Sequence, residues 1–103
     1  MRKVASIKKA GTTMTRAMTF ASEEGVYLFL YDSNADGPST ADHLFDTFEA
    51  AEAEAEETYG IAPDAWQIIP DPPPGCQHDW ISPTRVKQDA SGKKLRGQFE
   101  PAG

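Results

Sequence analysis

The chain of 103 residues has only one cysteine, Cys76, so no disulfide can form within it and cysteines alone cannot build a zinc site. It also lacks long hydrophobic runs, because none approaches the roughly 20 residues that a membrane-spanning helix requires. No apolar signal segment follows the basic residues at its start. These absences argue against a secreted or membrane protein and predict one cytoplasmic domain.

Cations are missing from the middle of the chain. Between Arg16 and Arg85 there is no Lys or Arg, whereas fourteen of the sixteen acidic residues lie there, and the formal net charge is −6. Binding of nucleic acid needs clustered cations that displace counterions, so we expect no nucleic-acid partner. A basic protein is the better match. The alternative is that the basic ends of the chain neutralise its acidic middle within the fold.

Alternation of apolar and polar residues predicts most of an antiparallel sheet. Residues 3 to 7 and 12 to 20 alternate, and the KKAG turn between them predicts a hairpin whose second strand buries one face. The run VYLFLY is apolar on both faces, which is typical of a central strand. Further strands are expected in the segments AWQIIP, SPTRVKQ and KLRGQF, followed by a disordered tail over about residues 98 to 103.

A helical period replaces the alternation from Asp42 onward. The apolar stripe consists of Leu44, Phe48, Ala51, Ala55 and Tyr59. Ser39 and Thr40 are candidate N-caps, and Gly60 is placed to end the helix as a left-handed C-cap. We therefore expect a single α+β domain over residues 1 to 103, in the order β-β-β-α-β-β. Its main amphipathic helix, residues 41 to 59, should pack on one face of an antiparallel sheet of roughly four to five strands.

The segment DSNADG matches the first half of a calcium-binding loop, in which oxygens at positions 1, 3 and 5 converge on the ion. The candidate ligands are Asp32, Asn34, Asp36 and Asp42. Position 12 needs a bidentate glutamate and is His43, so an EF-hand is excluded and only weak calcium binding is predicted. The alternative is a structural turn, because Asn, Asp and Gly tolerate left-handed backbone conformations.

The segment PGCQHDW is open to three interpretations. Cys76 and His78, with Asp79 orienting the histidine, would form the site of a small hydrolase. The same pair together with His43 and an aspartate would bind zinc, although no second pair with metal-ligand spacing completes that site. The third interpretation is structural: prolines stiffen a segment that crosses the end of the sheet and places Trp80 at the edge of the core.

A resemblance covers about two-thirds of the chain. Small bacterial proteins of unknown function contain a segment similar to YGIAPDAWQIIPDPPPGCQHDWISPTRVK, preceded by one similar to YDSNADGPSTADHLFDTFEAAEAEAEETYG. The resemblance implies a bacterial source and carries no substrate or catalytic residues. In size and acidity the chain is also similar to immunity proteins that neutralise basic toxins, which is an analogy of charge and not of motif.

The sequence favours a non-catalytic binding module for a basic protein. Its first group of contact residues lies on the exposed helix face: Asp46, Glu49, Glu56 and Glu57. A second group lies on the loop from Pro72 to Trp80: Gln77, His78 and Trp80. Tryptophan is enriched at binding hot spots, which is why this loop is expected to anchor the partner. A Cys/His hydrolase or metal-assisted enzyme, and a weak calcium-binding protein, are the alternatives.

Overall fold

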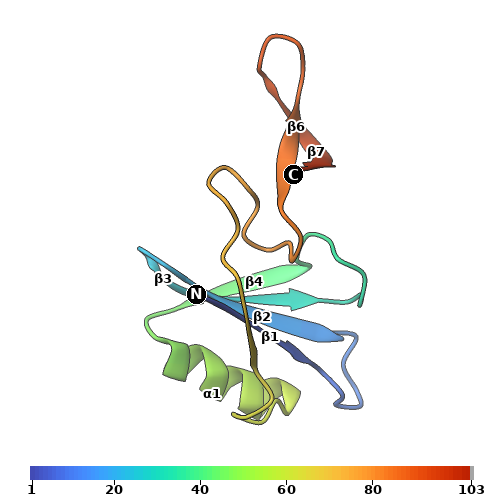
Figure 1. Cartoon of the computed structure of the whole chain (residues 1–103). Helices are drawn as coiled ribbons and strands as arrows, with labels where there is room; N and C mark the ends of the chain where they lie inside the picture. The colour runs from blue at the N-terminus through green and yellow to red at the C-terminus, as the bar shows by residue number, and fades with distance from the viewer. Residues whose placement is uncertain (103) are drawn as a thin grey trace.

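The computed structural model describes residues 1 to 102, with the backbone alone for Arg96. It confirms the predicted α+β class: one helix, an antiparallel sheet of five strands and a separate two-stranded hairpin (Figure 1). The strands of the sheet are β1 (Arg2–Ser6), β2 (Arg16–Ser22), β3 (Gly25–Tyr31), β4 (Ala41–Phe45) and β5 (Gln67–Ile69). The other elements are α1 (Phe48–Tyr59), β6 (Thr84–Gln88) and β7 (Lys94–Pro101).

The sheet has the strand order β4-β3-β2-β1-β5, and each neighbouring pair is antiparallel. The predicted hairpin of β1 and β2 is confirmed, with Val4 opposite Met18. The prediction that VYLFLY forms the central strand is wrong, because β4 adds outside β3 and β5 adds outside β1. The strand β3 is interior, and the central position belongs to β2.

The strand β2 is buried on both faces, whereas its alternation predicted burial on one. Ala17 belongs to the apolar cluster beneath α1, and Met18 and Phe20 belong to a second cluster on the opposite face. Residues 70 to 82 cover that second face, as their contacts with Phe20 and Tyr31 show. The alternation predicted burial of the face with Met18 and Phe20. The other face carries Ala17 and the fully buried Thr19, and it lies beneath α1.

The helix starts later than predicted, because the chain forms β4 before it. Ala41–Phe45 pairs along its whole length with β3, so hydrogen bonds across the sheet replace those of the first helical turns. Gly25 permits this pairing, since a Cβ there would lie 2.5 Å from the carbonyl oxygen of Phe45. The N-cap is Thr47, whose Oγ1 accepts the N–H of Ala50 at 3.1 Å, in place of Ser39 or Thr40.

The predicted end of the helix is confirmed. Gly60 adopts a left-handed conformation with φ of 70°, and its N–H donates to the carbonyl oxygen of Glu56 at 3.0 Å. The next residue, Ile61, turns back into the core and donates its N–H to the carbonyl oxygen of Ala55 at 3.3 Å. This cap fixes the direction in which the chain leaves α1 toward β5.

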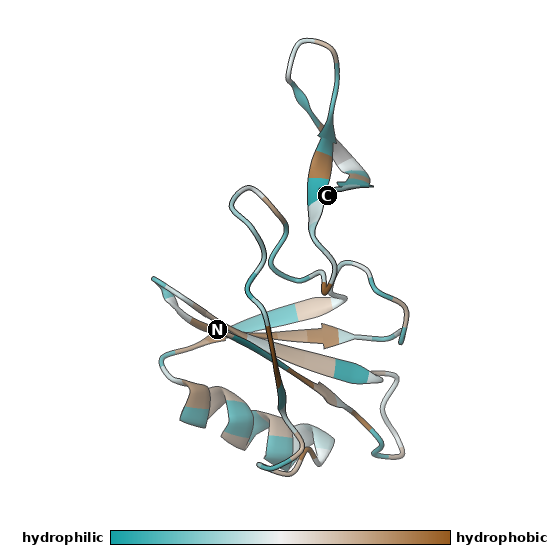
Figure 2. Ribbon diagram, viewed as in Figure 1, coloured by the Kyte–Doolittle hydropathy of each residue, from teal (hydrophilic) through white to brown (hydrophobic). Residues whose placement is uncertain are grey.

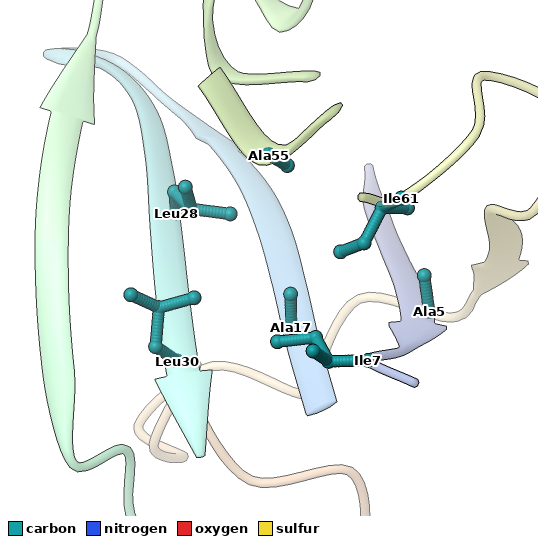
Figure 3. Packing of buried hydrophobic residues seen from close by; sticks show 7 residues of the cluster. All are labelled: Ala5, Ile7, Ala17, Leu28, Leu30, Ala55 and Ile61. Atoms are coloured by element: carbon teal, nitrogen blue, oxygen red, sulfur yellow. The ribbon is translucent and has the colours of Figure 1, made fainter. Parts of the chain in front are cut away.

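The core beneath α1 joins small helix residues to large strand residues. Ala51 and Ala55 are fully buried, which lets the helix lie close to the sheet. Figure 3 shows the seven residues of this cluster: Ala5, Ile7, Ala17, Leu28, Leu30, Ala55 and Ile61. Figure 2 shows brown, hydrophobic colouring along much of β2 and β3, teal along part of β4, and mixed colouring along α1. Each buried leucine contributes about 1.5–3 kcal/mol, so this face holds much of the hydrophobic stabilisation.

The hairpin of β6 and β7 projects away from the sheet on the side opposite α1 (Figure 1). Residues 98 to 101, predicted as disordered tail, are part of β7 because they pair with β6 and because Phe99 packs on Trp80, with ring centroids 5.2 Å apart. Residue 103 of that tail lies outside the described residues. The projection makes the radius of gyration 14.3 Å, against about 13 Å for a compact domain of this size. None of the described helical residues forms a segment long and apolar enough to cross a membrane.

Candidate functional site

A buried arginine holds residues 70 to 82, here called the strap, on the sheet face opposite α1. Arg2 is 2% exposed, and its Nε and Nη2 donate to the carbonyl oxygen of Pro70 at 2.9 and 2.6 Å. Its Nη1 donates to the carbonyl oxygens of His78 at 3.0 Å and Trp80 at 2.5 Å. Burial lowers the pKa of Arg2, but a guanidinium stays protonated in proteins and so makes charge-assisted bonds. One side chain therefore gathers both ends of the strap.

Two aromatic residues of the sheet also hold the strap. The hydroxyl of Tyr31 donates to the carbonyl oxygen of Asp79. The ring of His78 stacks on Phe20, with centroids 4.3 Å apart and an interplanar angle of 14°. Burial raises the pKa of Tyr31 well above its usual value, so the phenol stays a hydrogen-bond donor. These contacts hold the proline-rich segment in one shape before any ligand arrives.

The side chains of Cys76, His78 and Asp79 lie in different surroundings. Cys76 is 8% exposed, and the imidazole of His78 faces Phe20. The carboxylate of Asp79 accepts the N–H and the hydroxyl of Ser39, at 2.8 and 3.1 Å. The hydrogen bonds found among the described residues include none that joins two of these three side chains. The arrangement is that of a held loop, and it does not align a nucleophile, a base and an orienting acid.

Asp36, a candidate calcium ligand, also ties the strap. Its two carboxylate oxygens accept the backbone N–H groups of Ile81 and Ser82, each at 2.8 Å. Partial burial raises the pKa of Asp36, but hydrogen bonds from Ser82 and Ile81, together with the charge of Arg16, hold that pKa below its usual value. The carboxylate therefore acts as an acceptor for the end of the strap.

The other candidate metal ligands are not gathered around one point. Asp32 and Asn34 are exposed in the loop after β3, and Asp42 is exposed on β4. His43 lies opposite Leu28, which belongs to the cluster under α1, so the sheet separates it from Cys76 on the strap. In the part of the chain that the structure describes, no three His, Cys, Asp or Glu side chains are arranged to hold a metal ion.

The two groups of expected contact residues lie on opposite sides of the sheet. The acidic residues of the first group, Asp46, Glu49, Glu56 and Glu57, are all exposed on or just before α1. The strap residues Gln77, His78 and Trp80 lie on the other side (Figure 1). The two groups therefore do not belong to one binding surface.

Trp80 lies where the strap meets the hairpin. Its ring packs at 48° against Phe99, and the residue is half-buried. Its indole Nε1 is buried and has no partner among the described hydrogen bonds. Gln77 donates its backbone N–H to the carbonyl oxygen of Thr84 at 2.6 Å, at the start of β6. Both residues thus join the strap to the hairpin.

A groove lies between the strap and the sheet. One part has a volume of about 740 Å³ and the other about 380 Å³. Phe20, Tyr27 and His78 line both parts, so the two adjoin. The carboxylates along it are Glu23, Glu24 and Asp71 in the first part, and Asp42 and Asp79 in the second. Among the described side chains no Lys or Arg lines this groove, which is called the acidic groove below.

Aromatic rings and carboxylates are paired along the acidic groove. The rings of Tyr27 and Phe29 are parallel, with centroids 5.6 Å apart. The hydroxyl of Tyr27 donates to Oε2 of Glu24 at 2.8 Å, and this hydrogen bond raises the pKa of Tyr27. The phenol stays neutral, and the carboxylate of Glu24 lies at the hydroxyl end of the ring. Ring faces next to carboxylates attract ammonium and guanidinium groups.

Three of the five carboxylates already have partners, one of them Glu24, which accepts the hydroxyl of Tyr27. Asp79 accepts from Ser39, as described above, and Oδ2 of Asp71 lies 3.0 Å from the amino nitrogen of Met1. Glu23 and Glu24, at the turn between β2 and β3, are exposed, as is Asp42 on β4. These three supply most of the negative charge that an external ligand meets.

Sequence reasoning missed the acidic groove. It assigned no binding role to Glu23 or Glu24, and it placed Phe20, Tyr27 and Phe29 on strands. The available signal was the coincidence of two acidic turn residues with aromatic residues on one face of both flanking strands. These residues line a groove only because the strap lies beside them. Hydrogen bonds from Arg2 hold the strap there, and no periodicity in the sequence predicts them.

A second hollow, of about 740 Å³, lies near the end of β1 and has basic side chains along it. Lys8, Lys9 and Gly60 are among its lining residues. The ammonium of Lys9 donates to the carbonyl oxygen of Thr58 at 3.0 Å, at the C-terminus of α1. Its charge therefore stabilises a helix end, where cations are favoured.

Comparison of the chain with protein-family models, with curated proteins and with solved structures found no match.

Proposed function

We propose that the chain is a non-catalytic module that binds a basic segment of a protein partner in the acidic groove. The supporting observation is the make-up of that groove, which is lined by both aromatic rings and carboxylates, while none of the described lining residues is Lys or Arg. An ammonium or guanidinium over such a ring gains about 0.5–1 kcal/mol when exposed and about 2 kcal/mol when desolvated.

The rigidity of the strap also supports binding. Arg2, Tyr31 and Asp36 all hydrogen-bond to it, so the wall of the groove is fixed in the free protein. A fixed wall loses little conformational entropy when a ligand binds, which favours affinity. The open shape of the groove suits an extended polypeptide segment better than an enclosed small molecule.

The charge of the whole chain favours the same class of partner. A net charge of −6 attracts basic proteins over long range and repels nucleic acid. The single thiol, Cys76, is buried and free, which suits a reducing compartment such as the cytoplasm. We therefore place the interaction with a basic protein in the cytoplasm.

Calorimetric titration with two short peptides tests the proposal. One peptide is rich in lysine and the other has glutamate at the same positions. Binding of the lysine peptide alone is expected, and the variant E23Q/E24Q should weaken it about tenfold, because it removes two charges beside the ring of Tyr27.

The matched control removes the same charge from the helix face. The variant E56Q/E57Q changes two exposed glutamates of α1, on the other side of the sheet from the groove. It should leave the affinity within about twofold of wild type at physiological salt, because screening weakens distant charges. If E56Q/E57Q weakened the lysine peptide as much as E23Q/E24Q, the groove would not be the docking site.

A further inference from the structure

The β6–β7 hairpin has little support from the rest of its own chain. Among the described residues, β6 and β7 pair only with each other, with Val86 opposite Phe99. The contact of Phe99 with Trp80 joins the base of the hairpin to the strap, while the rest projects away from the sheet (Figure 1). A two-stranded hairpin is marginally stable alone in water, so a partner that packs on it would stabilise it.

The end of the hairpin is basic. Lys87, Lys93 and Lys94 are exposed, and none of the three ion pairs found among the described residues includes them. The carboxylate of Asp89 is already used within the turn, where Oδ1 accepts the N–H of Ser91 at 2.9 Å and that of Lys93 at 3.0 Å. The exposed charge of Asp89 offsets one of the three lysines, so this end presents a net positive charge outward.

The ion pair at the base leaves that charge in place. Nε of Arg85 lies 2.9 Å from Oε1 of Glu100, on the strand opposite. The charges of Glu100, on β7, and of Arg85, the first cation of β6, therefore offset each other. The net positive charge of the hairpin is thus concentrated toward its turn, away from the acidic body.

We propose that the hairpin of one copy of this chain docks in the acidic groove of a second copy. The inference rests on the proposed function, because it names the basic segment that the groove takes. The two surfaces are complementary in charge: exposed Lys87, Lys93 and Lys94 on the hairpin, and Glu23, Glu24 and Asp42 along the groove. None of the described residues from 84 to 102 lines the groove, so the hairpin does not fill the groove of its own chain.

The contact joins two different surfaces, so it is head-to-tail. Such contacts form a ring when the rotation closes and an open chain when it does not. Self-association should therefore increase with protein concentration and weaken as salt rises, since both surfaces are exposed to solvent.

Charge-swap variants, followed by sedimentation equilibrium, test the proposal. The groove variant E23K/E24K and the hairpin variant K93E/K94E should each sediment as a monomer of 11.2 kDa at concentrations where wild type associates. When mixed in equal amounts they should associate again, because each then meets a groove and a hairpin of opposite charge. Restored association also shows that both variants are folded.

The control E56K/E57K makes the same charge change on α1 and should associate like wild type. Wild type that stays monomeric up to about 1 mM, or an equimolar mixture of the two variants that stays monomeric, would overturn the proposal. Wild type that binds the lysine peptide in its groove yet remains monomeric would leave the proposed function standing and remove only this inference. Loss of both peptide binding and self-association would remove both.

Discussion

The two faces of the sheet are covered by different physical means. On one face α1 packs the fully buried Ala51 and Ala55 onto strand residues, so burial of apolar surface holds that layer. On the other face the strap has no regular secondary structure, and hydrogen bonds from Arg2 and Tyr31 to its carbonyl oxygens hold it. The helix face is thus a hydrophobic layer, and the strap face depends on a few polar side chains beneath an irregular segment.

This difference has a consequence for function. A layer held by apolar packing leaves little open space, whereas a segment held at a few points leaves gaps between those points. The acidic groove occupies such a gap, bounded by Phe20, Tyr27 and His78. The groove that we propose as the binding surface therefore lies on the face that depends on polar contacts.

Removal of Arg2 should have the largest effect on stability. Arg2→Met leaves the carbonyl oxygens of Pro70, His78 and Trp80 without their donor, and we expect a loss of about 3–4 kcal/mol in the free energy of unfolding. Urea titration followed by tryptophan fluorescence measures it.

The neighbouring cation on the other face is the matched control. Nζ of Lys3 lies 3.3 Å from Oε2 of Glu52 of α1 in a partly exposed ion pair. Lys3→Met should therefore lower the free energy of unfolding by about 1 kcal/mol or less. Equal losses for the two variants would show that the strap does not depend on Arg2 in the way described.

Overpacking the helix face should have the next largest effect. Ala55→Leu places three extra carbons in a fully buried site and should destabilise the protein by about 2–3 kcal/mol. Ala53→Leu makes the same change at an exposed position of α1 and should stay within about 0.5 kcal/mol of wild type. Thermal unfolding measures both. A tolerated leucine at position 55 would mean that α1 is packed more loosely than the structure indicates.

A smaller effect should locate the start of the helix. Thr47→Ala removes the acceptor of the Ala50 N–H and should lower stability by about 1 kcal/mol. Thr40→Ala removes only an exposed bond from the N–H of Asp32, at 3.2 Å, and should cost about 0.5 kcal/mol or less. Chemical denaturation followed at a helix-sensitive wavelength separates the two. The opposite order of effects would favour the start at residue 41 that the sequence predicted.

Those parts of the fold that depend on local periodicity could be predicted from the sequence. The hairpin of β1 and β2, the strand β5 and the cap at Gly60 each follow from residues close together in the chain. The start of α1 could not, because β4 exists only through pairing with β3, and its stripe from Leu44 to Phe48 fits a helix as well. Competition between a distant strand partner and a local helical turn is decided by tertiary contacts.

The candidate site was less predictable than the fold. Arg2 was counted as part of a basic end, yet it is fully buried and bonds to residues that lie 68 to 79 positions further along the chain. Asp36 matched a metal-ligand position, and its carboxylate instead binds the N–H groups of the strap. An aspartate that accepts backbone N–H groups and an aspartate that binds a cation are the same residue type. The spacing of residues alone therefore does not distinguish the two roles.

The smallest expected effect is the pH dependence that Asp36 gives to the strap face. Because its pKa in the folded protein lies below the usual value, the unfolded chain binds a proton more readily than the folded one. The stabilising contribution of this carboxylate is therefore fully present above about pH 4, the usual range of an aspartate. It is lost as the pH falls through the depressed value of the folded protein.

The variant Asp36→Ala isolates this contribution from that of other carboxylates. Asp89, for example, also has a lowered pKa, owing to hydrogen bonds from Ser91 and from the N–H of Lys93. Such groups titrate equally in wild type and variant, so they cancel in the difference between the two unfolding free energies. That difference should be constant from pH 7 to about pH 5 and shrink below about pH 4. A difference that stayed constant down to pH 2 would mean that the charge of Asp36 does not hold the strap.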